Sequence, residues 1–385
     1  MNETGLALLE KLVAFNTVSD QPNLALIDFM QDFLESRGFR VTRLADPSEP
    51  KAGLYAEIGP TGAGVLLSAH TDVVPVTGQN WSRDPFRLTV EDGHAYGRGT
   101  TDMKGFVAAM LGMADQASRR PLAEPLKLVF SYDEEIGCIG IARMMERLRP
   151  LMGQPRMAIV GEPTAMQVAT GHKGKRSYAA VIKGQAGHSA LAPRFVNALQ
   201  VAVDVITALR ELQEDLVLQS SPDPAYDIPY STLHVGTLSG GRALNIVPDR
   251  AEMRFELRHM AQDDPDALEA RLREAANKVC TRHGPPAEIE IRPVSHYPGL
   301  EIAPGTAIVR DVAQLAGRGT TKVAFGTEAG FFAGAGIPTV VCGPGSMAAQ
   351  GHKADECIAL SELAACQSML DRLLNSMSDQ GGGRV

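Results

Sequence analysis

The chain has no apolar run that approaches the roughly 20 residues needed to cross a bilayer, and it has no cluster of basic residues. Its 37 Lys and Arg face 45 Asp and Glu, so the net charge is −8, which disfavours nucleic acid or an anionic membrane as a partner. The N-terminal residues MNETGLALLEKL lack the basic region and apolar core of a signal peptide. These absences predict a cytoplasmic protein that binds neither membranes nor nucleic acid.

Cysteine pairs and several common catalytic signatures are also missing. The five cysteines are odd in number and form no CxxC pair, which argues against a disulfide framework or a cysteine-ligated zinc site. The chain has no G-x-S-x-G nucleophile elbow, no G-x-x-x-x-G-K-[ST] phosphate loop and no H-E-x-x-H helix. Any catalysis must therefore rest on another arrangement of side chains.

The 385 residues have the composition of a globular protein, with 44% hydrophobic and 21% charged residues. At about 150 residues per domain, this length suggests two or three domains. The first part of the chain alternates helical and strand patterns, which favours an α/β sheet covered on both faces. The patterns predict strands at 39–44, 54–58, 65–71, 126–132 and 157–160, and helices at 5–15, 22–36, 104–117 and 138–148.

The pattern changes in the middle of the chain. Its predicted elements follow the order β-α-β-β-α-β of a ferredoxin-like unit. They are strands at 176–183, 231–238, 250–258 and 287–292, and helices at 196–213 and 265–280. Helices at 305–316 and 361–376 then alternate with strands at 322–325 and 338–342. We therefore expect a discontinuous α/β domain, residues 1–175 and 293–385, with a second domain inserted at 176–292.

Acidic and imidazole side chains recur where the apolar strands end. In open α/β sheets, ligands bind outside the carboxyl ends of the strands. Side chains two apart on a strand point the same way, so neighbours such as His70 and Asp72 can enter one cavity. The candidates are His70, Asp72, Asp102, Asp133, Glu134, Glu135, Glu162 and His352.

Imidazoles and carboxylates without a thiolate suit zinc, cobalt or manganese. Five ligands are too many for one tetrahedral ion with an open position, but they suit two ions that share a bridging carboxylate. Such a site also needs a carboxylate that is not a ligand, as general base. Glu134 and Glu135 could divide these two roles. Taken singly, a histidine at a strand end can be structural, and Asp-Glu-Glu can be a solvated turn.

Six short strings carry a resemblance to a known family. The chain resembles the di-zinc aminoacylase/carboxypeptidase family along almost its whole length. The strings are SAHTDVVP (68–75), GRGTTDMKG (97–105), SYDEEIGCIG (131–140), GEPT (161–164), GHSA (187–190) and GHKADE (351–356). The resemblance implies a discontinuous di-zinc aminopeptidase-like α/β catalytic domain with an inserted ferredoxin-like α+β lid. It also implies a homodimer formed through that lid.

The same resemblance implies a set of metal ligands. His70 and Glu162 would hold one Zn²⁺, Glu135 and His352 would hold the other, and Asp102 would bridge them. Cobalt or manganese could substitute for zinc.

Roles beside the metals follow from the resemblance as well. Glu134 is expected to be the general base, and Asp72 is expected to orient His70 through its second ring nitrogen. The peptide after Asp102 is expected to be cis. His188 in GHSA is expected to stabilise the oxyanion, either within its own subunit or from across a dimer interface. The alternative for His188 is an ordinary histidine on the lid surface.

Substrate recognition is expected to involve three further residues. Arg258 could bind a substrate α-carboxylate through two hydrogen bonds, with Asn245 as its partner. Glu328, in FGTEAGFF, could attract a cationic side chain such as an ornithine ammonium group. The alternatives are a solvated arginine on an edge strand and a structural or solvated carboxylate.

The Thr-Glu-Ala sequence around Glu328 is similar to the acetylornithine deacetylase branch of the family. It implies that the substrate is a small N-acyl amino acid, N2-acetyl-L-ornithine, which is hydrolysed to acetate and L-ornithine in arginine biosynthesis. Two alternatives stay open. One is a succinyl-diaminopimelate desuccinylase or another N-acyl-amino-acid deacylase, and the other is a non-catalytic, metal-dependent binding protein.

Overall fold

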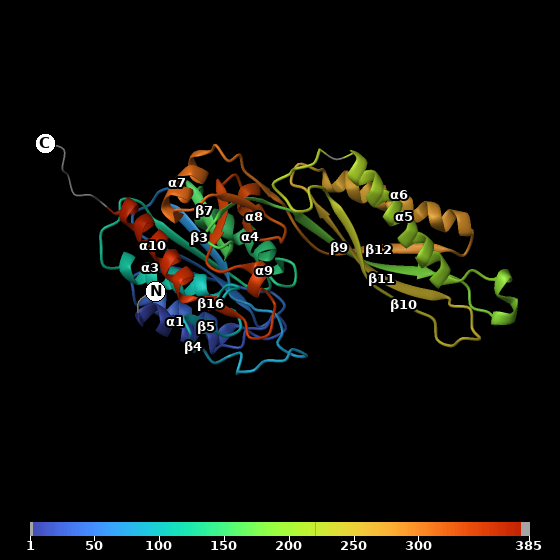
Figure 1. Cartoon of the computed structure of the whole chain (residues 1–385), viewed down its shortest axis with the longest axis horizontal. Coiled ribbons are helices and arrows are strands. Elements are labelled where there is room, and N and C mark those ends of the chain that lie inside the picture. Colours follow the sequence, from blue (N-terminus) through green and yellow to red (C-terminus); the bar gives the residue numbers. More distant parts are fainter. Residues whose placement is uncertain (1–2, 220, 379–385) are drawn as a thin grey trace. The chain divides into compact units, whose positions relative to one another are not determined.

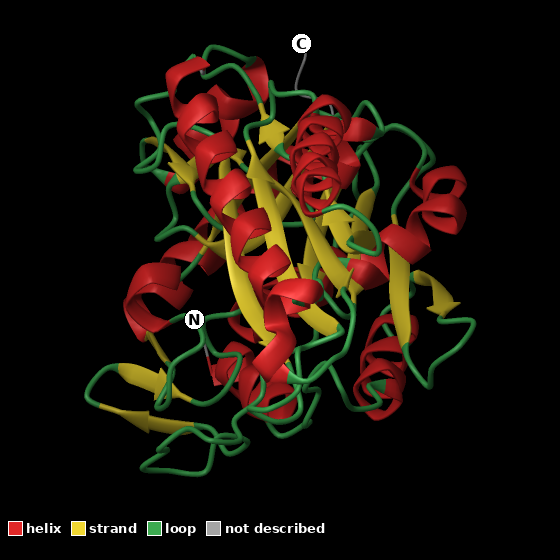
Figure 2. Cartoon of the chain, turned by 90° about the vertical axis from the view of Figure 1, so that its right-hand side faces the viewer, coloured by secondary structure: helices red, strands yellow, loops and turns green. Residues whose placement is uncertain are grey.

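The computed structural model describes residues 3–219 and 221–378, which separate into two compact units (Figure 1). Within the described chain, unit 1 comprises residues up to 171, 300–323 and the residues from 327 onward. Unit 2 comprises residues 172–299 and 324–326. Both units combine helices and strands, which Figure 2 colours by type.

Unit 2 is larger than the insertion expected at 176–292, and its borders show why. Its first strand already begins at Gly174, and its last strand continues to Tyr297. The short segment 324–326 also belongs to unit 2. A Cβ atom at Gly326 would lie 2.1 Å from the ring of Tyr297, so only glycine allows this approach.

The strands of unit 1 form a nine-stranded mixed sheet in the order β1-β2-β6-β3-β7-β15-β8-β13, with β14 paired to β8. The four central strands β6, β3, β7 and β15 run parallel to one another. The nine strands are β1 (Arg40–Ala45), β2 (Ala52–Ile58), β3 (Val65–His70), β6 (Leu126–Ser131), β7 (Met157–Pro163), β8 (Val168–His172), β13 (Leu300–Glu301), β14 (Thr320–Val323) and β15 (Thr339–Gly343).

Helices pack on both faces of this sheet, so its central strands are buried at every position. Helices α1, α2, α3, α7 and α10 share one continuous core with the sheet, whereas α4 packs on β2 and β6, and α8 on β7 and β15. The helices are α1 (Glu3–Val13), α2 (Leu24–Glu35), α3 (Lys104–Ala117), α4 (Ile139–Met152), α7 (Ala307–Ala316), α8 (Ala329–Gly334), α9 (Met347–Gln350) and α10 (Leu360–Met377).

Unit 2 is an antiparallel sheet of β10, β11, β9 and β12, in that spatial order, with α5 and α6 packed on one face (Figure 1). This order and the β-α-β-β-α-β sequence are those of a ferredoxin-like unit. Its elements are β9 (Gly174–Lys183), the short 3₁₀ helix η1 (Ser189–Arg194), α5 (Ala198–Gln219), β10 (Thr232–Gly240), β11 (Arg250–His259), α6 (Pro265–His283) and β12 (Glu288–Tyr297).

The α/β architecture expected from the sequence is confirmed, but several short elements were not predicted. A third sheet joins β4 (Thr89–Glu91), β5 (His94–Tyr96) and β16 (Cys357–Ala359). Elements of two to five residues show too little periodicity to be recognised, and β16 pairs with a strand more than 250 residues away. All five cysteines are free and buried. None of the described helices has the length and apolar character needed to cross a membrane.

Candidate metal centre

Several acidic and imidazole side chains of unit 1 lie at the carboxyl end of its central parallel strands. His70 is the last residue of β3, and Glu162 is the next-to-last residue of β7. Glu135 follows β6 in the loop that leads to α4. Asp102 precedes α3, and His352 follows α9. Segments far apart in the sequence therefore deliver polar side chains to the edge of the sheet where α/β proteins bind ligands.

These five residues form two groups that share Asp102. His70, Asp102 and Glu162 offer ligand atoms within 4.8 Å of one another, and so do Asp102, Glu135 and His352. The Asp102 Oδ1 atom lies 3.1 Å from His70 Nε2, and Oδ2 lies 3.3 Å from His352 Nε2. One carboxylate thus turns one oxygen to each group, which is the arrangement of a bridging ligand.

Buried oxygen atoms in both groups indicate that cations fit here. His70 Nε2 lies 3.7 Å from Glu162 Oε1, and His352 Nε2 lies 3.0 Å from Glu135 Oε2. Among the described residues, Glu162 Oε1 and Glu135 Oε1 are buried and have no hydrogen-bond donor. A buried carboxylate oxygen without a partner is costly, and a bound cation would satisfy it.

The pKa shifts of the side chains in the centre also indicate a site for cations. Burial raises the pKa of Glu162 well above its usual range and that of Glu135 to about 7, and neighbouring carboxylates add to both shifts. Hydrogen bonds to Asp102 and Glu135 raise the pKa of His352 to about 10. Burial favours a neutral His70, but the charge of Glu162 and the hydrogen bond to Asp102 outweigh it, so the His70 pKa is raised. The neighbouring carboxylates retain protons because their negative charges repel one another. A divalent cation would neutralise these charges and take the place of the protons.

Asp72 supports the metal centre chiefly by holding the backbone around it. Its carboxylate accepts hydrogen bonds from Ser19 Oγ at 2.7 Å, Glu134 N at 3.1 Å and Glu135 N at 3.3 Å. His70 Nδ1 lies 3.5 Å from Asp72 Oδ1 and closer, 3.0 Å, to the Asp72 main-chain oxygen. The orientation of the His70 ring therefore depends on both the backbone and the side chain of Asp72.

Glu134 lies beside the centre but belongs to neither ligand group. Its Oε1 atom accepts a hydrogen bond from Cys138 Sγ at 3.3 Å. Burial raises the pKa of Glu134 to about 8, and the charges of Glu135 and Asp102 push it upward against the pull of His70. A carboxylate with a pKa near neutrality can both accept and donate a proton at physiological pH.

Glu356, which the sequence patterns did not single out, holds part of the candidate centre in place. Its carboxylate accepts hydrogen bonds from the backbone amides of Gly99, Thr101 and Asp102, at 2.9, 2.8 and 3.1 Å. It therefore holds the loop that presents the shared carboxylate. The peptide bond after Asp102 is cis, as the resemblance implies. A signal for Glu356 was available, because it closes the GHKADE string that begins beside His352.

Glu328 lies in the interior of unit 1 at the start of α8, with only 1% of its surface exposed. Ser68 Oγ donates a hydrogen bond to its Oε2 atom at 3.4 Å, and Oε1 has no partner among the described residues. Burial raises its pKa to about 7. Its charge acts on His70 and Asp72, so Glu328 belongs to the electrostatic environment of the centre.

His188 and Asn245 lie on neighbouring segments of unit 2. Ser189 N donates to Asn245 O at 3.0 Å, and His188 forms an isolated bridge with Ile246. His188 is exposed and precedes η1, where its Nδ1 atom accepts a hydrogen bond from Ala190 N at 3.1 Å. These backbone contacts bring the segments of His188 and Asn245 together within unit 2.

Arg258 lies on β11, and its side chain is 34% exposed. Its Nε atom donates to Glu256 Oε1, two residues away on the same face of the strand, at 2.8 Å. Glu256 thus accepts from one of the five N–H donors of this guanidinium group.

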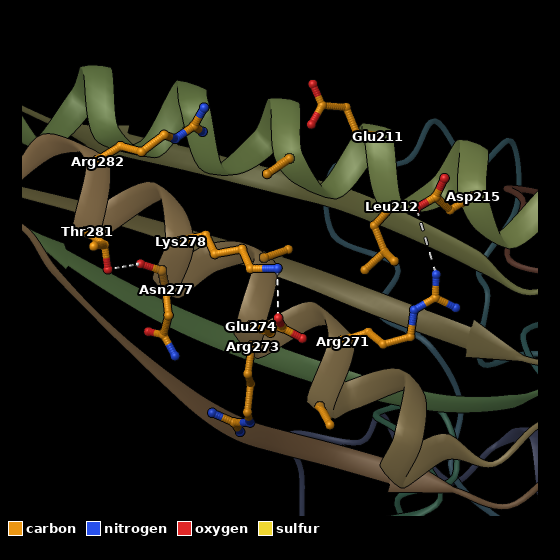
Figure 3. A pocket seen from close by; sticks show the side chains of 13 residues that line it. Glu211, Leu212, Asp215, Arg271, Arg273, Glu274, Asn277, Lys278, Thr281 and Arg282 are labelled. Carbon is orange, nitrogen blue, oxygen red and sulfur yellow. Dashed lines mark hydrogen bonds and ion pairs between the residues drawn. The ribbon is translucent and has the colours of Figure 1, made fainter.

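A surface groove of about 1070 Å³ lies between α5 and α6 of unit 2 (Figure 3). Four of its charged side chains form ion pairs with one another: Arg271 pairs with Asp215 at 3.9 Å, and Lys278 pairs with Glu274 at 2.7 Å (Figure 3). The groove contains neither histidine nor cysteine. We therefore assign it no part in the chemistry.

Comparison with known proteins places this geometry in a family. Residues 66–376 match the model of peptidase family M20/M25/M40. The chain belongs to this family. The matched segment spans every member of the two ligand groups, from His70 to His352. The resemblance to di-zinc aminoacylases and carboxypeptidases is thereby confirmed.

Two relatives that match most of the chain are acetylornithine deacetylases. The protein of Shigella sonnei is 37% identical over 339 residues, which cover 88% of this chain and 86% of the relative. The protein of Myxococcus xanthus is 34% identical over 372 residues and covers 95% of both chains.

Solved structures of more distant proteins share the fold. The M20 family metallo-carboxypeptidase Sso-CP2 of Sulfolobus solfataricus superposes with a TM-score of 0.79 at 20% identity, covering 97% of this chain and 99% of that one. Aminopeptidase PepT of Bacillus cereus gives a TM-score of 0.77 at 20% identity, covering 97% and 98%.

Proposed function

We propose that this protein is a metal-dependent amidohydrolase that converts N2-acetyl-L-ornithine to acetate and L-ornithine, a step of arginine biosynthesis. The observation that carries the proposal is the pair of ligand groups that share Asp102, with the Glu134 carboxylate beside them. The two acetylornithine deacetylases that match most of the chain support this choice of substrate.

We assign two Zn²⁺ ions to the centre. His70 and Glu162 would hold one ion, Glu135 and His352 the other, and Asp102 both. When bound, the ions would polarise the acyl carbonyl and make water more acidic. Cobalt or manganese suits the same oxygen and nitrogen ligands.

In the proposed reaction Glu134 is the proton carrier. It accepts a proton from the water that attacks the acetyl carbonyl, and it returns a proton to the amide nitrogen as the carbon–nitrogen bond breaks. Its pKa near neutrality suits both directions of transfer. The hydrogen bond from Cys138 Sγ and the contact of its backbone amide with Asp72 support its orientation.

Residues of unit 2 are proposed to recognise the rest of the substrate. The exposed His188 imidazole is suited to donate a hydrogen bond to the oxyanion, and Arg258, with Asn245, to bind the α-carboxylate. Glu328 is proposed to favour the ornithine ammonium group. Because only 1% of Glu328 is exposed, we assign this effect to its charge.

The test is a comparison of substrates with the zinc-loaded and the cobalt-loaded protein. N2-acetyl-L-ornithine, N-succinyl-diaminopimelate and N-acetyl-methionine are assayed in parallel, and kcat/KM is expected to be highest for the first by a factor of ten or more. A preference for the succinyl compound would replace the proposal with a desuccinylase. Two bound metals without turnover of any of the three would favour a binding protein.

We also propose that the protein works in the cytoplasm as a homodimer formed through unit 2. Among the described residues, the exposed large hydrophobic side chains other than Val90 and Ile136 belong to unit 2. Leu238 lies on the edge strand β10, and Leu244 in the loop that follows it is fully exposed. Sedimentation of the wild type and of the Leu238→Asp variant would test the assembly, with a dimer expected only for the former.

A further inference from the structure

The loop that carries His352 has an unusual backbone, and one neighbouring segment holds it. His352 and Asp355 have φ values of +60° and +54°, which are uncommon for residues other than glycine. Such residues persist where their surroundings fix them. Gln79 Nε2 donates to the main-chain oxygen of His352 at 2.9 Å, and Ser82 N donates to Asp355 Oδ1 at 2.9 Å. The segment 79–82 thus contacts both residues.

Gln79 uses both ends of its side-chain amide. Its Oε1 atom accepts hydrogen bonds from Arg98 Nη2 at 2.5 Å and from Trp81 Nε1 at 3.0 Å. Guanidinium and indole groups only donate, and the His352 carbonyl only accepts. The chemistry of the three partners therefore fixes the orientation of the amide and leaves its NH₂ group for the His352 loop.

Arg98 connects this contact to the loop of Asp102. Its Nη1 atom donates to Glu356 Oε2 at 2.8 Å and to Lys353 O at 3.2 Å. Only 1% of the Arg98 and Glu356 side chains is exposed, and Glu356 binds the backbone amide of Asp102. One hydrogen-bond network therefore joins the loops that present the shared ligand and His352.

We propose that Gln79 is a positioning residue that sets the His352 loop, and with it the affinity of the second metal position, formed by Glu135, His352 and Asp102. The inference rests on the proposed pair of metals. His70 and Glu162 lie outside the contacts of Gln79, and the first position shares only Asp102 with this network, so we expect the first position to depend far less on Gln79. Residues that orient metal ligands in this way typically change affinity by about 10–100-fold when mutated.

The decisive variant is Gln79→Glu. A glutamate keeps an oxygen for Arg98 and Trp81, but it turns a carboxylate oxygen toward the carbonyl of His352 in place of the NH₂ donor. Equilibrium dialysis of the metal-free protein against buffered zinc, followed by metal analysis, separates the two binding steps. We expect the second equivalent to bind about 10–100-fold more weakly and the first to stay within twofold of the wild type.

Two further variants sharpen the result. Gln154→Glu is the matched control, because Gln154 Nε2 also donates to a main-chain carbonyl, that of Ala335 at 3.3 Å, but contacts no ligand loop. It is expected to bind both equivalents as the wild type does. Gln79→Met has similar length and no hydrogen bonds, and it is expected to weaken the second equivalent as well. Because Trp81 itself donates to Gln79, the folding of the variants is checked by far-UV circular dichroism and not by tryptophan emission.

The outcomes separate this inference from the proposed function. If Gln79→Glu binds both equivalents with wild-type affinity, or weakens both equally, Gln79 does not position His352. If the wild type itself binds a single equivalent, the pair of metals is wrong, and the inference fails with it. Two equivalents in the wild type and a selective loss of the second in both Gln79 variants support the inference, whatever the substrate.

Discussion

The two units bury their sheets in different ways. In unit 1 the central strands β3, β6, β7 and β15 are buried at every position, because helices cover both faces. In unit 2 strand β11 alternates between buried and more exposed residues, because α5 and α6 cover one face only. Because helices cover both faces of the unit 1 sheet, polar side chains gather at the ends of its strands, outside the apolar core.

This difference decides what each unit can do with charge. The carboxylates at the strand ends of unit 1 are removed from water, so burial raises their pKa values and leaves oxygen atoms without partners. On the uncovered face of the unit 2 sheet, charged residues pair with their neighbours, as Arg258 does with Glu256. Unit 1 therefore has the conditions for binding cations, whereas unit 2 offers accessible polar groups.

The largest effect is expected from Asp102→Ala. This change removes the carboxylate common to both ligand groups. We expect loss of both bound metals and no detectable hydrolysis, measured by metal analysis and by release of ornithine. Retention of two equivalents of zinc would show that Asp102 does not bridge them.

Replacing the proton carrier is expected to separate metal binding from catalysis. Glu134→Gln keeps the size of the side chain and removes its basicity, and Glu134 lies outside both ligand groups. Since general base catalysis typically contributes about 10²–10⁴-fold, we expect kcat to fall by that factor. The variant should keep both metals, and a variant with wild-type kcat would exclude Glu134 as the base.

Cys138 offers a finer test of the buried site. Its thiol donates to Glu134, so Cys138→Ala removes a donor and Cys138→Ser retains one. A hydrogen bond contributes about 1 kcal/mol net, so we expect kcat to fall roughly fivefold in the alanine variant. The serine variant should recover most of this loss at unchanged metal content. Equal kcat in both variants would show that the contact has no influence on Glu134.

The stability of the metal-free protein should depend on pH in a defined direction. Burial and neighbouring carboxylates raise the pKa of Glu135 to about 7, and hydrogen bonds to carboxylates raise that of His352 to about 10. Both groups bind protons more tightly in the folded than in the unfolded state, so stability falls as pH rises between about 6 and 8. We expect a Tm several degrees lower at pH 8 than at pH 6, and bound zinc should abolish the difference. A Tm that rises with pH without metal would contradict these shifts.

A change confined to unit 2 should leave the metal centre intact. Asp264 caps α6 and accepts a hydrogen bond from Asp266 N at 2.9 Å. Asp264→Ala is expected to lower stability by about 1 kcal/mol, the usual loss for an N-cap, as measured by denaturant unfolding. Zinc stoichiometry should stay that of the wild type. Loss of metal from this variant would mean that the centre depends on the local stability of unit 2.

Much of the architecture could be predicted from local patterns. The helix predicted at 104–117 has the bounds found for α3, because small apolar residues fill one continuous buried segment. The strand predicted at 322–325 begins and ends two residues earlier, at 320–323, because residues 324–326 belong to unit 2. No local periodicity signals that a chain leaves one unit for three residues and then returns.

The candidate site likewise has one part that the sequence predicts and another that it does not. The residue types and their places after apolar strands determined which side chains could meet a cation, because strand ends share one edge of the sheet. Only the tertiary structure decided that each oxygen of Asp102 faces a different histidine, that Glu356 holds the backbone before it, and that Gln79 reaches the carbonyl of His352. These contacts join segments up to 273 residues apart. Those of Glu356 and Gln79 also have backbone atoms as partners, which carry no signature in the sequence.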